Sequence, residues 1–215
     1  MRLGLASLLA ISIAFGGVAA TGQAYERREP ASMTATRALQ KARVAARKGD
    51  HSGAIASFDK VLLLEPDFAS VITERAFSRE ALGDLSGAQD DYREAARLEP
   101  DQANAWSHVA WIEALRGGDL DQALADSEKA VALGATNDAV STRGFVRYRR
   151  GEYVQALSDH NAVLAKHPRA ASLLFMRGVI KRRLDQGAEG DADIARAVKI
   201  DSSVEALWAR RGVTP

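Results

Sequence analysis

A spacing of 34 residues constrains this 215-residue chain more than any other feature of its sequence. Pro66 and Pro100 are 34 residues apart, and Pro168 follows after twice that interval. The segments around the first two prolines, Leu64–Asp67 and Leu98–Asp101, are identical. Internal periods of this length occur where one supersecondary unit is stacked repeatedly, so the sequence predicts a repeat architecture.

Small residues recur at the same interval, which predicts pairs of closely crossing helices. The first set is Ala42, Ala76, Ala110, Gly144 and Gly178, and the second is Ala54, Ala88 and Ala156, with an aromatic or His four residues later in each case. Gly-Asp pairs at 49–50, 83–84 and 118–119 mark the turns, because Gly ends one helix in the left-handed conformation and Asp caps the next. Each proline then ends a second helix, since the residue before Pro avoids helical geometry.

This pattern resembles the tetratricopeptide repeat, which has a small residue at position 8, Ala at 20, an aromatic near 24 and Pro at 32. The resemblance covers nearly the whole mature chain and implies an all-α fold, a right-handed superhelical solenoid of about five helix-turn-helix repeats. The repeats are expected at residues 35–68, 69–102, 103–136, 137–170 and 171–204. Residues 205–215 are expected to form a capping helix and a tail.

The N-terminus has the pattern of an export signal. Arg2 precedes an apolar run from Leu3 to Val18, and small residues follow where a signal peptidase cuts. We therefore predict a signal peptide at 1–24, a flexible leader at 25–34, and a periplasmic protein; secretion, or anchoring by an uncleaved signal, are the alternatives. No later segment is apolar enough to span a membrane. The chain has no Cys, which excludes disulfides and Cys-ligated zinc.

Charge is balanced overall but unevenly distributed. The chain has 29 basic and 28 acidic side chains, which gives no reason to expect a nucleic-acid partner. Between Asp50 and Asp138 there are 18 acidic and 7 basic residues, whereas between Arg143 and Arg183 there are 10 basic and 2 acidic. Head-to-tail contact between such regions would produce heterologous assembly, so weak self-association is one prediction.

Chemistry-bearing motifs are missing from the sequence. No two of the four His stand at i, i+4, there is no nucleophile elbow, and the adjacent carboxylates of Asp90 and Asp91 point in different directions on a helix. We therefore expect no catalytic residue, no metal and no cofactor, and we predict that the chain is not an enzyme. His160 is expected in the core, like Trp106 and Trp208.

The resemblance implies that first-helix side chains line a concave groove that binds an extended peptide or a short helix. The matching positions here are Leu39, Arg43, Arg47, Phe77, Trp111, Phe145, Tyr148, Arg149, Phe175, Arg182 and Arg183. We expect Phe77, Trp111 and Phe145 to form an exposed aromatic stripe flanked by arginines. The predicted function is a non-catalytic scaffold for a partner protein or peptide with acidic groups. A self-assembling structural protein and a glycan-binding envelope protein are the alternatives.

Overall fold

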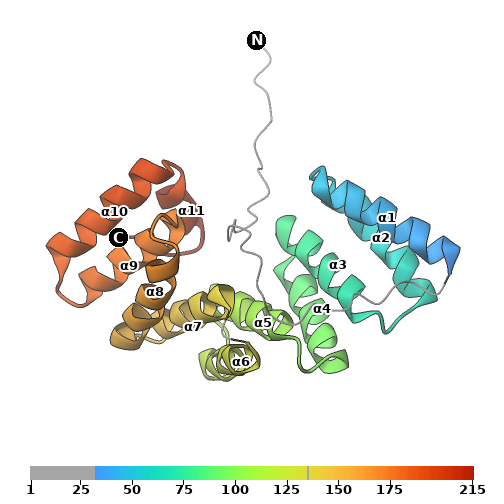
Figure 1. Ribbon diagram of the computed structural model, residues 1–215, viewed down its shortest axis with the longest axis horizontal. Helices are drawn as coiled ribbons and strands as arrows, with labels where there is room; N and C mark the ends of the chain where they lie inside the picture. Colours follow the sequence, from blue (N-terminus) through green and yellow to red (C-terminus); the bar gives the residue numbers. More distant parts are fainter. Residues whose placement is uncertain (1–31, 135) are drawn as a thin grey trace, which may run out of the picture. The chain divides into compact units, whose positions relative to one another are not determined.

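The computed structural model describes residues 32–134 and 136–215, which contain eleven helices and no strand (Figure 1). The chain divides into two units, one of residues up to Glu99 and one from Pro100 onward, called here the N-terminal and C-terminal units. The predicted signal peptide at 1–24 and most of the leader at 25–34 lie outside the described residues.

The N-terminal unit consists of two helix hairpins, drawn in blue to green in Figure 1. Its helices are α1 (Met33–Arg47), α2 (His51–Leu64), α3 (Ala69–Ala81) and α4 (Leu85–Leu98). Helix α1 pairs with α2, α3 pairs with α4, and α3 also packs on α2. The buried side chains of Leu39, Phe58, Val61, Phe68 and Val71 form a core between the helices.

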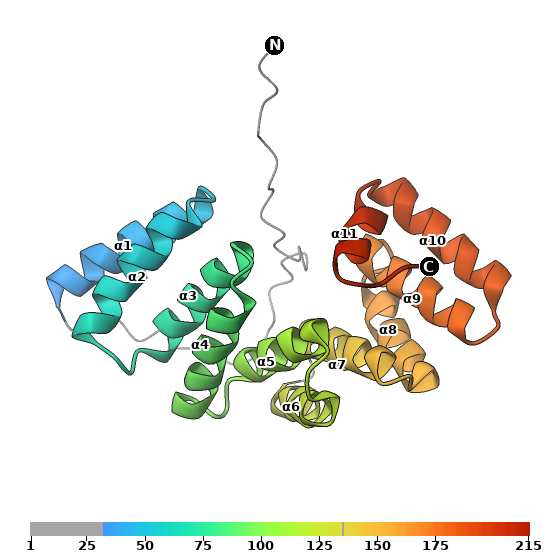
Figure 2. The same cartoon turned by 180° about the vertical axis from the view of Figure 1, so that it is seen from behind.

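The C-terminal unit consists of three further hairpins and a final short helix (Figure 2). Its helices are α5 (Ala103–Arg116), α6 (Leu120–Leu133), α7 (Asn137–Arg149), α8 (Tyr153–Lys166), α9 (Ala171–Arg183), α10 (Gly187–Ile200) and α11 (Val204–Arg210). Each hairpin packs on the next, with α7 against α5 and α6, and α9 against α8. The five hairpins predicted from the 34-residue spacing are therefore all present.

The predicted turn chemistry is confirmed in the first two hairpins, whereas in the third the left-handed residue is Gly117, with φ of 69°, and not the predicted Gly118. Gly49 and Gly83 have φ values of 79° and 83°, in the left-handed region that Gly adopts without steric cost. The carboxylates of Asp50 and Asp84 then accept hydrogen bonds of 2.9 Å from the backbone N–H groups of Gly53 and Gly87. Each side chain satisfies a helical donor that has no partner within its own helix.

Helix boundaries follow the sequence signals closely. Helices α2, α4 and α8 end two residues before Pro66, Pro100 and Pro168. Helix α1 begins at Met33, inside the predicted leader, because the Ser32 hydroxyl caps it by accepting from the N–H of Ala35 at 3.1 Å. Within the described part of the chain, no helix is both long enough and apolar enough to cross a membrane.

Candidate functional site

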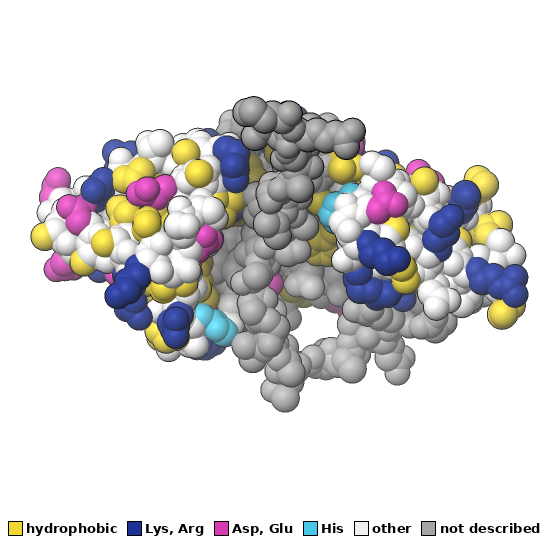
Figure 3. Space-filling view, turned by 90° about the horizontal axis from the view of Figure 1, so that it is seen from above, with side chains coloured by type: hydrophobic (Ala, Val, Ile, Leu, Met, Phe, Trp, Pro, Cys, Tyr) yellow, Lys and Arg dark blue, Asp and Glu magenta, His cyan; other side chains and the backbone are white. Residues whose placement is uncertain are grey.

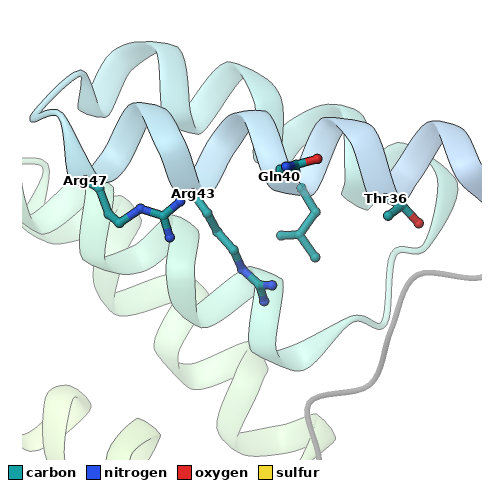
Figure 4. A pocket seen from close by; sticks show the side chains of 5 residues that line it. Thr36, Gln40, Arg43 and Arg47 are labelled. Carbon is teal, nitrogen blue, oxygen red and sulfur yellow. The ribbon is translucent and has the colours of Figure 1, made fainter.

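A shallow pocket of about 270 Å³ lies along helix α1 of the N-terminal unit (Figure 4). It is lined by Thr36, Leu39, Gln40, Arg43 and Arg47. Apart from the neighbours Leu39 and Gln40, successive members of this set are three or four positions apart, which places them on one side of the helix. Three of them were predicted as groove residues, and the structure adds Thr36 and Gln40.

Arg43 is held in place by a carboxylate from the neighbouring hairpin. Its Nε lies 2.9 Å from Glu74 Oε2 and its Nη2 lies 2.7 Å from Glu74 Oε1, a bidentate pair that joins α1 to α3. Both side chains are about three-quarters buried. The ion pair therefore fixes the geometry of the pocket wall, while Arg47, one turn further along α1, lies exposed at its edge.

Phe77 lies one turn after Glu74 on α3 and remains 44% exposed. Its ring meets the edge of Tyr92 on α4, with centroids 5.5 Å apart and an interplanar angle of 83°. The Tyr92 hydroxyl donates a hydrogen bond of 3.2 Å to Glu80 Oε2. Burial and the charge of Glu80 raise the pKa of Tyr92 well above its usual value, so this hydroxyl stays protonated and donates to Glu80.

We use the name α1–α3 face for the pocket residues Thr36, Gln40, Arg43 and Arg47 together with Phe77, which does not line the pocket but lies on α3 one turn beyond the Glu74 that pairs with Arg43. It combines Arg43, whose charge is paired with Glu74, the exposed Arg47, two neutral polar side chains and one partly exposed aromatic ring. This arrangement suits the binding of an acidic and apolar segment of another molecule. Among the described residues, no cluster of three His, Asp or Glu could hold a metal ion.

The expectation of an exposed aromatic stripe is wrong for the C-terminal unit. Trp111 is only 6% exposed, and Phe145 and Phe175 are fully buried. Helix α11 contributes to the burial of Trp111 and Phe145, because the centroid of its Trp208 ring lies 6.1 Å from that of Trp111 and 5.6 Å from that of Phe145. Helix α11, expected only to cap the stack, also covers the face on which the first helices were expected to remain open.

The other predicted groove residues of this unit have varied surroundings. Tyr148 is half-buried and stacks on Phe145, with ring centroids 6.3 Å apart. Arg149 is also half-buried. Arg182 forms an ion pair of 2.6 Å with Asp191 of α10, in its own hairpin, and Arg183 is exposed. The structure therefore does not assemble these residues into an open groove.

Sequence reasoning missed an aspartate held between two cations, which recurs in three hairpins. The N–O distances lie between 2.6 and 2.9 Å, and the sets are Asp91 with Arg75 and Arg79, Asp159 with Arg143 and Arg147, and Asp193 with Arg177 and Lys181. Burial of Asp193 would raise its pKa, but hydrogen bonds from Arg177 and Lys181 lower it below the usual value. Each set joins the two helices of one hairpin. The 34-residue recurrence of these residues was the available signal.

These ion pairs change the interpretation of the basic stretch between Arg143 and Arg183. Many of its cations are matched by acids of the same unit, so its charge is locally compensated. On the face shown in Figure 3, Lys and Arg side chains are interspersed with acidic, polar and hydrophobic ones. Head-to-tail association of acidic and basic regions stays a prediction.

Comparison with known proteins agrees with this helical arrangement. A family model described as the tetratricopeptide repeat matches residues 36–68, the first predicted repeat. The crystal structure of PilW, a widely conserved type IV pilus biogenesis factor, is similar with a TM-score of 0.71 and 19% identity, covering 84% of this chain and 87% of that one. The fold is that of a tetratricopeptide-repeat protein. YrrB, described as a tetratricopeptide-repeat protein with an unusual peptide-binding site, is similar with a TM-score of 0.62 and 18% identity over 83% of this chain and 92% of its own.

Two human proteins match parts of the chain. Tetratricopeptide repeat protein 36 is 33% identical over 96 residues, which are 43% of this chain and 50% of that protein. Protein O-mannosyl-transferase TMTC1 is 35% identical over 72 residues, which are 32% of this chain but 8% of the transferase. The chain therefore spans half or less of the length of these relatives. The tetratricopeptide-repeat fold is typically non-catalytic.

Proposed function

We propose that this chain is a non-catalytic scaffold that binds a segment of a partner protein on the α1–α3 face. Tetratricopeptide-repeat proteins generally act as protein-interaction scaffolds. The observation that carries the proposal is the pocket on α1, where exposed Arg47 lies beyond an Arg43 already oriented by Glu74. The peptide-binding site described for YrrB supports the same class of function by analogy of fold.

The chemistry of the face indicates the chemistry of its ligand. Arg47 suits a carboxylate, Thr36 and Gln40 can hydrogen-bond to an extended backbone, and the ring of Phe77 offers an apolar contact. Burying one apolar anchor contributes about 1.5–3 kcal/mol. After the cost of ordering the peptide, we expect affinity of roughly micromolar order. The charged contact would mainly raise the association rate and would weaken with salt.

A matched pair of charge reversals on α1 tests the proposal. Arg47 lines the pocket, whereas Arg37 is exposed on the same helix and is not among the lining residues. Arg47→Glu and Arg37→Glu change the net charge equally, so they differ only in position. Affinity capture from an envelope extract, quantified by mass spectrometry, should recover a partner with wild type and Arg37→Glu and lose it with Arg47→Glu. A partner set that is the same for all three proteins would overturn this assignment.

We also propose that the partner is met outside the cytoplasm, with the periplasm as the preferred compartment. The support is the sequence of residues 1–24, in which a basic start, an apolar run and small residues follow in the order of a signal peptide. In this setting the ligand would be a segment of another exported or envelope protein.

A further inference from the structure

Among the described helices of the C-terminal unit, α11 is the one that has no hairpin partner. It follows the last repeat after a short turn and lies against α9 and α10 (Figures 1 and 2). Its Val204 and Trp208 are buried, and Gly212, with φ of 74°, turns the chain back so that Val213 is buried as well. Three apolar side chains thus hold this segment against the unit.

The main contact of α11 is aromatic. Trp208 packs against both Trp111 of α5 and Phe145 of α7, with ring centroids 6.1 and 5.6 Å away, and these two rings contact each other with centroids 4.7 Å apart. The guanidinium of Arg211 lies 5.1 Å from the Trp111 ring and 5.0 Å from the Trp208 ring. We call the surface formed by Trp111 and Phe145 the aromatic face. The aromatic face is occupied by the C-terminal segment, through the ring of Trp208 and the guanidinium of Arg211, which directly follows α11.

The contact between α11 and the aromatic face leaves two buried polar groups without hydrogen bonds. The indole Nε1 of Trp111 and that of Trp208 are both buried, and neither has a hydrogen-bond partner among the described residues. Buried polar groups are nearly always paired in folded proteins, so two such donors in one contact weaken it. A ligand that places an acceptor oxygen beside Trp111 would satisfy a donor that α11 leaves unsatisfied.

Helix α11 is also weakly supported by its own backbone. It has seven residues, too few for a helix to be stable in isolation, and the Ser203 side chain makes no capping hydrogen bond. The segment therefore keeps its helical form through its contact with the unit. A contact of this kind opens locally at a lower free energy than the hairpins beneath it.

We infer that the aromatic face is a binding site for a short helix of a partner protein, and that α11 is its resident ligand, which the partner displaces. The partner helix presents a large aromatic anchor in the position of Trp208 and an acceptor oxygen for Trp111 Nε1. This inference concerns the C-terminal unit and does not depend on the α1–α3 face.

The test uses the full chain and a labelled peptide with the sequence of residues 203–215 as the probe. In wild type, the tethered α11 competes with the peptide at high effective concentration. Trp208→Ala weakens this competitor and should raise the affinity for the peptide by about tenfold or more, measured by fluorescence anisotropy. A peptide with Ala in place of its own Trp should not bind.

Trp106→Ala is the matched control, because it removes the same ring at another site. The Trp106 indole donates to the Pro100 carbonyl oxygen at 3.0 Å and lies beneath Lys129, away from the aromatic face. This variant should bind the peptide no better than wild type. Equal peptide binding by Trp208→Ala, Trp106→Ala and wild type would overturn the inference.

If Trp208→Ala does not fold, hydrogen exchange measured on the wild-type protein tests the inference instead. Amides of α11 should exchange at least about a hundredfold faster than those of α7. The reason is that α11 can detach while the hairpins of the C-terminal unit stay folded. Equal protection of α11 and α7 would identify α11 as a fixed structural cap and overturn the inference. A dimer that forms with increasing concentration and disappears in Trp208→Ala would also overturn it, by assigning the face to a second copy of this chain.

Discussion

At the residue scale, buried charge holds the two helices of a hairpin together. Asp159 is 4% exposed, and two guanidinium groups, those of Arg143 and Arg147, bind it at 2.6 and 2.8 Å. A hydrogen bond from Arg143 to this carboxylate is the main reason why the pKa of Arg143 is raised. The carboxylate is desolvated and fully matched, so its removal leaves two partly buried cations without their acceptor.

Replacing Asp159 should therefore destabilise the chain measurably. We expect Asp159→Ala to lower the free energy of unfolding by about 1–3 kcal/mol, measured by urea denaturation. Glu94→Ala is the control, because Glu94 pairs with Arg97 at 2.7 Å on an exposed helix surface. The control should leave the urea midpoint unchanged, since exposed ion pairs contribute little. Equal effects of the two substitutions would show that the aspartate network is not structural.

We expect His160 to make the stability of the C-terminal unit depend on pH. It is fully buried, and its Nδ1 lies 2.9 Å from the carbonyl oxygen of Ala156. Burial lowers the pKa of His160 below its usual value, although Ala156 and the charge of Asp159 act in the opposite direction. The unfolded chain therefore binds a proton at a higher pH than the folded one does.

Stability should fall as the pH is lowered below about 6.5, the ordinary pKa of His, with a slope of up to about 1.4 kcal/mol per pH unit from this residue. His160→Phe should flatten the slope between about pH 6.5 and 5, where carboxylates are still ionised. Urea denaturation at several pH values measures it. The other three His are common to both proteins, so an unchanged slope would contradict this assignment.

At the element scale, helix crossings depend on small side chains. A Cβ atom added at Gly178 on α9 would lie 2.6 Å from the carbonyl oxygen of Gly190 on α10, and one at Gly190 would lie equally close to that of Gly178. The two backbones are therefore in direct contact. In this last hairpin Gly190 replaces the usual Ala, so neither helix carries a Cβ atom at the crossing of Gly178 and Gly190.

Gly178→Ala should force α9 and α10 apart. We expect a loss of about 1–3 kcal/mol from the clash, reduced by the roughly 1 kcal/mol that Ala gains over Gly inside a helix. Gly187→Ala at the start of α10 is the control, because no atom lies within 4 Å of the added Cβ and the site should tolerate it. Thermal unfolding followed by circular dichroism measures both. If Gly178→Ala lowered the stability no more than Gly187→Ala, the close crossing of α9 and α10 would be contradicted.

The sequence predicted the positions of the helices far better than it predicted which of their side chains are exposed for binding. The spacing of Pro66, Pro100 and Pro168 and the Gly-Asp turns located the hairpins, because those residues act on the local backbone. The burial of Trp111 was not predictable in this way, since it depends on where α11 folds back. A periodic pattern defines the faces of a helix but does not say which non-repeating segment will cover one of them.

At the scale of the whole molecule, the distribution of charge along the sequence does not describe how the charges pair in space. Counting charges along the chain cannot show that Asp159 and Asp193 neutralise cations of their own hairpins. The predicted groove residues likewise divide into two groups, because Arg43 and Arg47 line an open pocket while Trp111 and Phe145 lie under α11.

Export of the molecule makes a separate prediction. Residues 1–24 should carry a fused reporter enzyme, one that is active only in the periplasm, into that compartment. The mature protein should have a lower mass than the full chain, by the mass of the signal peptide. Intact mass spectrometry of the protein from the envelope fraction measures the cleavage position. Full-length protein in the cytoplasm would contradict the proposed location. That result would not bear on binding at the α1–α3 face.

The most direct test of partner binding at the α1–α3 face is site-specific photo-crosslinking in living cells. A benzophenone amino acid replaces Gln40 in the pocket or, as the control, Lys60, which is exposed on α2 of the same hairpin. We predict a discrete adduct with one partner protein from position 40, none from position 60, and loss of the adduct when Arg47→Glu is added. No adduct at position 40, or the same adduct at both positions, would contradict the account.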